Sequence, residues 1–220
     1  MNKVLLVEGD VDDAFFNSII GKLETVVDIE VKKGGGVPKI FEKLKTLVRT
    51  GIRQLGIALD IDAKDEEHIY KEVFDVLVNE FGVENIEKIS QNEMHVKNTY
   101  LVIIPAGIKE EPLLQEFGIK KHAIEDYVIR ILKEDDNLAK TLSKGKFKST
   151  ELIECLREAV DSLKPDCIEL SSSKQLLDLT KAIMGFRASP AVFTKEVVDN
   201  SNSEILEGVI KDLKRILQNW

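Results

Sequence analysis

The chain has little cysteine and no long apolar run. Its 220 residues include two cysteines, Cys155 and Cys167, whose separation does not match the CxxC pairs of zinc sites. So few cysteines favour a reduced, cytoplasmic protein over an exported one held by disulfides. The apolar run at residues 4–7 is too short for a signal peptide, and no segment approaches the roughly 18 apolar residues of a membrane span. We therefore expect a cytoplasmic protein that does not insert into membranes.

Proline, glycine and positive charge are also scarce. The chain has 5 Pro and 13 Gly, and 43% of its residues are hydrophobic, which excludes collagen-like and low-complexity classes. Acidic residues outnumber basic ones by 39 to 31, so the net charge is −8. This sign excludes general electrostatic binding of nucleic acid or membranes. It is compatible with carboxylates gathered at one metal site, where the cation would meet a phosphate.

Apolar runs alternate with amphipathic segments in the first half of the chain. Strands are predicted at residues 4–7, 26–31, 55–59 and 100–104, with a short edge strand at 86–89. Helices are predicted between them, at residues 15–23, 40–48 and 69–78. This order predicts an α/β fold with a mainly parallel sheet that is covered by helices on both faces.

The second half has a different pattern. Apolar residues recur at helical spacing near residues 122–133, 149–163, 173–185 and 203–219. We therefore expect an α/β core at 1–107 and a mostly helical extension at 108–220, and the two parts can share one hydrophobic core.

Acidic residues directly follow two of the predicted strands. Glu8 and Asp12 come after the first strand, and Asp60 and Asp62 come after the third. In an open parallel sheet, sites form at the carboxyl ends of the strands. Residues two apart in extended chain point the same way, so Asp60 and Asp62 can present both carboxylates to one cation. Ligands of this kind suit Mg²⁺ or Mn²⁺.

These segments resemble the two signatures of the TOPRIM domain of topoisomerases, primases and overcoming-lysogenization-defect nucleases. Residues 7–12 read Val-Glu-Gly-Asp-Val-Asp, and residues 59–62 read Leu-Asp-Ile-Asp. The resemblance covers roughly residues 1–107 and implies a Rossmann-like TOPRIM core with metal-dependent phosphodiester or phosphoryl-transfer chemistry on nucleic acid. It implies catalytic roles for Glu8 and Asp12, and Mg²⁺ or Mn²⁺ coordination by Glu8, Asp60 and Asp62.

A later stretch is similar to uncharacterised TOPRIM-like families related to the same nucleases. There, a strand that ends in proline precedes a helix with an acidic residue between hydrophobic ones. The corresponding residues here are Val-Ile-Ile-Pro at 102–105 and Ile-Glu-Asp-Tyr-Val at 124–128. This resemblance implies that Glu125 is a further metal ligand.

Several residues also have simpler explanations. Asp10, Asp12 and Asp13 would favour the N-terminus of the helix that follows them, whatever their role in chemistry. The glycines at 34–36 fit a phosphate-binding loop, but they lack the spacing of known phosphate motifs and fit a turn better.

Two other functions stay open on the sequence alone. A non-catalytic TOPRIM-like interaction module, including a homo-oligomer, would keep the fold without turnover. A receiver-like domain would use Asp60 as phosphoacceptor, with Asp12 and Asp13 as its acidic pair and Lys109 as its lysine.

Overall fold

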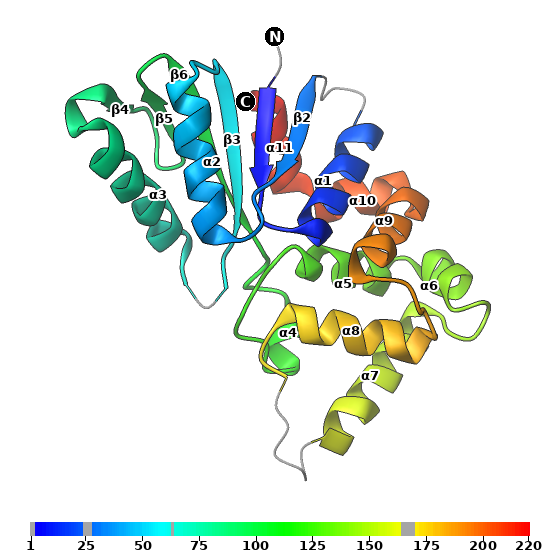
Figure 1. Ribbon diagram of the computed structural model, residues 1–220. Helices are drawn as coiled ribbons and strands as arrows, with labels where there is room; N and C mark the ends of the chain where they lie inside the picture. Colours follow the sequence, from blue (N-terminus) through cyan, green and yellow to red (C-terminus); the bar gives the residue numbers. More distant parts are fainter. Residues whose placement is uncertain (1–2, 24–27, 63, 164–169) are drawn as a thin grey trace.

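The computed structural model describes residues 3–23, 28–62, 64–163 and 170–220 (Figure 1). Its centre is a six-stranded sheet in the order β2-β1-β3-β6-β5-β4. The strands are β1 (Lys3–Val7), β2 (Ile29–Lys33), β3 (Gln54–Asp60), β4 (Ile86–Lys88), β5 (Glu93–Val96) and β6 (Thr99–Ala106). The four strands β2, β1, β3 and β6 are parallel, which confirms the α/β class and the mainly parallel sheet.

The apolar runs correctly located most of these strands. In β1, β3 and β6 nearly every side chain is buried, as expected for strands covered on both faces. The strand expected at 26–31 is found at Ile29–Lys33, and residues 26 and 27 lie outside the described part of the chain. The short edge strand expected at 86–89 is β4.

The strand β5 was not predicted, and it makes one edge of the sheet antiparallel. β5 pairs antiparallel with β6, through a turn at residues 97–98, and β4 pairs antiparallel with β5. The edge strand expected at 86–89 is thus separated from β6 by a strand that was not predicted. β5 was not predicted because it has only two apolar residues, Met94 and Val96, which do not form an apolar run.

Helices cover both faces of the sheet. The first three are α1 (Asp10–Lys22), α2 (Val37–Arg49) and α3 (Glu66–Phe81), and the 3₁₀ helix η1 (Val83–Asn85) follows α3. α2 and α3 share one hydrophobic cluster with Leu6 and Ile57 of the sheet. α1 packs on the opposite face, in a cluster with Leu5 and Val7. The alternation of neighbouring β1 residues between two clusters is the two-residue period of a strand.

The described part of the second half is helical. Its helices are α4 (Pro112–Glu116), α5 (Glu125–Glu134), α6 (Asp136–Leu142), α7 (Ser149–Leu163), α8 (Ser173–Met184), α9 (Pro190–Asn200), α10 (Ser203–Val209) and α11 (Lys211–Asn219). The segment expected as one helix at 203–219 is two, and α4, α6 and α9 were not anticipated. α9 lies along α1, so its apolar residues join the cluster on that face of the sheet (Figure 1). Residues of both halves thus share one core.

None of the helices among the described residues combines the length and the apolar character that a membrane crossing requires.

Candidate functional site

Glu8 and Asp60 meet at the carboxyl edge of the sheet. Their strands, β1 and β3, are parallel neighbours, so the chain leaves both strands at the same edge. The Oε1 atom of Glu8 accepts a hydrogen bond from the backbone N–H of Asp60 at 2.9 Å. Burial and the nearby charge of Asp60 raise the pKa of Glu8 to about 7. The two acidic motifs therefore share one cluster of charges.

Asp60 is a buried carboxylate with one ion pair. Only 6% of its surface is exposed. Its Oδ2 atom lies 2.7 Å from Nζ of Lys174, whereas its Oδ1 atom is buried without a hydrogen-bond partner among the described residues. Burial raises the pKa of Asp60, and the charge of Lys174 opposes that rise. Asp60 thus has one oxygen that pairs with a cation and one without a hydrogen bond of ordinary geometry among the described residues, although the backbone N–H of Ile124 also lowers its pKa.

Asp12 has a structural contact as well as a place in the cluster. It lies in the first turn of α1, and its Oδ2 atom accepts the backbone N–H of Gly9 at 3.0 Å, which stabilises the start of the helix. Burial, followed by the charges of Asp60, Glu125 and Glu8, raises the pKa of Asp12 to about 8. The capping explanation is therefore correct for Asp12, but it does not account for the acidic surroundings.

Glu125 joins the same cluster from the second half of the chain. It is the first residue of α5, and only 3% of its surface is exposed. Burial and the charge of Asp60 raise its pKa to about 7. Glu8, Asp12, Asp60 and Glu125 are therefore close enough for their charges to interact.

Asp62 lies at the solvent side of this cluster. Its side chain is exposed, and its φ of 52° is left-handed, a conformation that Asp adopts more readily than most residues. Its backbone N–H donates to the carbonyl of His122 at 2.8 Å, and its carbonyl accepts from the N–H of His122 at 3.0 Å. Its charge contributes to the raised pKa values of Glu8 and Asp60.

A buried pair, His122 and Asp126, lies beside the cluster. The Oδ2 atom of Asp126 is 3.0 Å from Nδ1 of His122 and accepts the backbone N–H of Ile108 at 2.8 Å. Burial lowers the pKa of His122 and raises that of Asp126 to about 7, so the contact is better described as a hydrogen bond than as an ion pair. Asp126 therefore ties the loop after β6 to the start of α5.

Lys174 is the residue of this site that the sequence did not reveal. It lies in the first turn of α8, 114 residues after Asp60. The Ser172–Gln175 capping box is a sequence signal for the start of that helix, but not for a contact with the sheet. Burial lowers the pKa of Lys174, and the charge of Asp60 more than offsets this, so that the net pKa is raised.

A groove of about 510 Å³ opens beside these acids. Its lining includes Glu8 and Asp12, the three glycines at 34–36, and the lysines Lys33, Lys43 and Lys174. The glycines do not offer their amides to it: the N–H of Gly34 donates to Val7, and those of Gly35 and Gly36 donate to the carbonyl of Glu8. The triglycine loop is therefore a turn that holds the backbone of Glu8.

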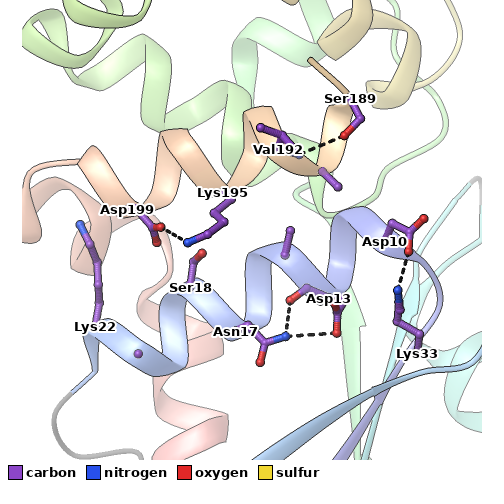
Figure 2. A pocket seen from close by; sticks show the side chains of 13 residues that line it. Asp10, Asp13, Asn17, Ser18, Lys22, Lys33, Ser189, Val192, Lys195 and Asp199 are labelled. Carbon is purple, nitrogen blue, oxygen red and sulfur yellow. Dashed lines mark hydrogen bonds and ion pairs between the residues drawn. The ribbon is translucent and has the colours of Figure 1, made fainter.

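A larger groove, of about 790 Å³, lies along α1 and α9 and shares Asp10 and Lys33 with the smaller groove (Figure 2). Its charged side chains largely satisfy one another: Lys33 pairs with Asp10 at 2.8 Å, and Lys195 pairs with Asp199. Figure 2 also shows Asn17 bonded to Asp13 within the same helix. This groove has the greater volume, but its charges are paired locally and it lacks a cluster of buried acids.

The cluster fits a divalent cation in donor type. Mg²⁺ and Mn²⁺ prefer carboxylate oxygens, and the unpartnered Oδ1 atom of Asp60 is such a donor. Across the described residues, however, no three His, Cys, Asp or Glu side chains already have an arrangement that could hold a metal. In the arrangement described here, the cation at Asp60 is the ammonium of Lys174.

Comparison with known proteins gives a family. The family model described as "Protein of unknown function (DUF3226)" matches residues 2–218. The chain belongs to this family. Among solved structures, the DUF3226 chain resembles the hypothetical protein PH0156 from Pyrococcus horikoshii OT3, with a TM-score of 0.65 and 14% identity over 100% of this chain and 99% of the other. At that identity the likeness shows a shared fold alone. No functionally curated protein matches the chain significantly.

Proposed function

We propose that this protein carries out Mg²⁺- or Mn²⁺-dependent phosphodiester or phosphoryl-transfer chemistry on nucleic acid, as a TOPRIM-like nuclease does. The observation that carries the proposal is the cluster of Glu8, Asp12, Asp60 and Glu125, four acids buried or half-buried around one edge of the sheet. Ionised carboxylates are costly to bury unless a cation or protons offset their charge. Such clusters of perturbed acids are typical of functional sites.

Each acid has a distinct place in the proposed chemistry. Asp60, Glu8, Glu125 and the exposed Asp62 would hold the metal, which stabilises the charge that develops on a transferring phosphate. The pKa of Glu8, about 7, lets its carboxyl hold or release a proton near neutral pH. Asp12 keeps the Gly9 turn in place, and this turn directly follows Glu8.

The substrate would approach through the smaller groove. The net charge of −8 repels a polyanion, so binding must depend on local cations. The lysines Lys43 and Lys174 line the groove next to Glu8 and Asp12. A phosphate could therefore meet ammonium groups there while it reaches the acidic edge of the sheet.

The proposal is tested by metal binding and cleavage in parallel. Purified protein is titrated with Mn²⁺ by calorimetry, and is incubated with single- and double-stranded DNA and RNA in the presence of Mg²⁺ or Mn²⁺. We expect binding and cleavage in the wild type, and loss of both in Glu8→Gln and Asp60→Asn. The matched control is Glu67→Gln, an exposed acid in the first turn of α3. The absence of both metal binding and cleavage in the wild type would contradict the proposal.

A non-catalytic interaction module is the second candidate, and one observation favours it. The ion pair of Lys174 with Asp60 offsets part of the buried charge without any metal. This candidate predicts a folded protein that cleaves none of these substrates, with or without bound Mn²⁺ or Mg²⁺. For the receiver-like alternative, the structure gives Asp60 a different lysine partner, Lys174 in place of Lys109.

A further inference from the structure

Lys174 is carried to the acidic cluster by the second half of the chain. Figure 1 shows α8 beyond the edge at which the parallel strands end. Two short backbone bridges connect them: Asp62 pairs with His122, and Lys121 pairs with Ser172. The N–H of Ser173 also donates to the carbonyl of Lys121 at 3.0 Å. The backbone beside Lys174 is thus fixed relative to the sheet edge.

The position of Lys174 is unfavourable for the helix that carries it. The N-terminus of a helix has a partial positive charge, which favours acids and disfavours lysine in the first turn. Lys174 nevertheless lies in the first turn of α8. The contact that offsets this is external to the helix, the 2.7 Å ion pair with Asp60. The placement is therefore explained by the acidic cluster and not by helix stability.

The ion pair also occupies the carboxylate that a metal would need. Asp60 gives its Oδ2 atom to the ammonium, while its Oδ1 atom has no partner in the described chain. Two cations cannot both lie against this one buried group without repelling each other strongly. By contrast, the Lys174 side chain is 56% exposed, so its ammonium has solvent to move into.

We propose that Lys174 is a tethered cation that holds Asp60 in the metal-free protein and competes with a divalent metal ion for that carboxylate. This inference rests on the proposed function, because it requires a metal at the cluster. A metal on the free Oδ1 atom of Asp60 would lie close to the ammonium on Oδ2, and the repulsion between the two cations would displace Lys174. Its ammonium then remains in the groove that Glu8, Asp12 and Lys43 line, where it can pair with a phosphate oxygen of the substrate.

The test compares the Mn²⁺ affinity of lysine variants by calorimetry in the full chain. Lys174→Met removes the competing charge, and we expect Mn²⁺ to bind about tenfold more tightly. Lys174→Arg keeps the charge and should bind Mn²⁺ within about twofold of the wild type. The matched control is Lys43→Met, because Lys43 lines the same groove but donates to the backbone carbonyl of Lys33. Its affinity should also stay within about twofold.

Thermal unfolding supplies a second readout that does not depend on activity. In EDTA, Lys174→Met should lower Tm, because Asp60 loses its partner. Added Mn²⁺ should raise the Tm of this variant by more than that of the wild type, since at one ligand concentration a tighter ligand stabilises the folded state more. If Lys174→Met does not fold in EDTA, Lys174→Gln takes its place in both measurements.

The possible results distinguish a failure of this inference from a failure of the proposed function. Wild-type binding of Mn²⁺ with unchanged or weaker binding in Lys174→Met would overturn the competition and leave the metal site in place. Wild-type binding of Mn²⁺ that tightens in Lys174→Met and is unchanged in Lys174→Arg would support the competition. No binding in either would contradict both.

Discussion

The carboxylate of Glu8 accepts a hydrogen bond from the backbone N–H of Asp60, across the junction of two parallel strands. This bond places a side chain of the first acidic motif directly on the backbone of the second. Glu8 has two properties that a variant can separate, its hydrogen bond to Asp60 and its charge. The amide oxygen of a glutamine can accept the same bond but carries no charge.

That separation gives the first prediction. Glu8→Gln should leave the free energy of unfolding in EDTA within about 1 kcal/mol of the wild type, because the bond to Asp60 can be kept and a half-buried charge is removed. The same variant should bind Mn²⁺ at least about tenfold more weakly, because the metal loses an ionised ligand. Glu8→Ala loses the bond as well, leaves the Asp60 N–H without its acceptor, and should cost about 1 to 3 kcal/mol more than Glu8→Gln. Urea unfolding and calorimetry measure the two effects. A destabilisation of Glu8→Gln as large as that of Glu8→Ala would show that the bond depends on the charge.

The second prediction concerns pH. The folded-state pKa values of Glu8, Glu125 and Asp126 are raised to about 7, and that of Asp12 to about 8. A raised pKa means that the folded state binds more protons than the unfolded state between the two pKa values, so stability falls as pH rises through that window. The metal-free protein should therefore lose stability between about pH 5 and pH 8.

Urea unfolding in EDTA at several pH values measures this slope. Asp12→Asn cannot ionise at this position, so its stability should depend less steeply on pH than that of the wild type. Glu67→Gln, which changes an exposed acid, should keep the wild-type slope. A rise in wild-type stability from pH 5 to pH 8 would contradict the burial of these acids.

The third prediction concerns the pair of His122 and Asp126. Asp126→Ala removes the acceptor of two hydrogen bonds, one from the Ile108 amide and one shared with His122. Leaving such groups unsatisfied costs about 1 to 3 kcal/mol, and we expect a loss of stability in this range. Hydrogen exchange should show the amide of Ile108 losing protection. Unchanged protection of that amide would rule out the role of Asp126 as the tie between the loop after β6 and α5.

The fourth prediction concerns a tight contact inside the sheet. A Cβ atom at Gly56 would lie 2.8 Å from the ring of Trp220 and 3.0 Å from a methyl group of Leu5. Gly56→Ala should therefore destabilise the protein by about 1 to 3 kcal/mol. The matched change is Gly21→Ala in α1, where nothing lies within 4 Å of the added atom; it should be neutral or stabilise by up to about 1 kcal/mol. Trp220→Ala should make Gly56→Ala less harmful, and additive effects in this cycle would argue against the contact.

Much of the fold could be predicted because three of its strands are continuous apolar runs in the sequence. β1, β3 and β6 are buried on both faces, so each is an unbroken apolar run in the sequence. β5 has no such run and depends on its partners in the sheet. α9 does have a sequence signal for its start: Ser189 is the N-cap and accepts the N–H of Val192, and Pro190 follows at the first helical position.

Some residues of the candidate site could likewise be predicted from the sequence, and others could not. Glu8 and Asp60 directly follow strands, and the parallel order of those strands brings them together. Lys174 and its contact with Asp60 depend on how α8 packs against the sheet edge, which no spacing within the sequence encodes. The burial that raises the pKa values of the acids is likewise a property of the assembled core.

The proposed function requires a divalent metal to bind among Glu8, Asp60 and Glu125. The most direct measurement is anomalous diffraction from crystals of the wild-type protein soaked in Mn²⁺. We expect a peak within coordinating distance of the Asp60 carboxylate, roughly 2.0 to 2.5 Å, with Lys174 turned away from it. An absence of any peak at the cluster, with Lys174 still paired to Asp60 at saturating Mn²⁺, would contradict the account.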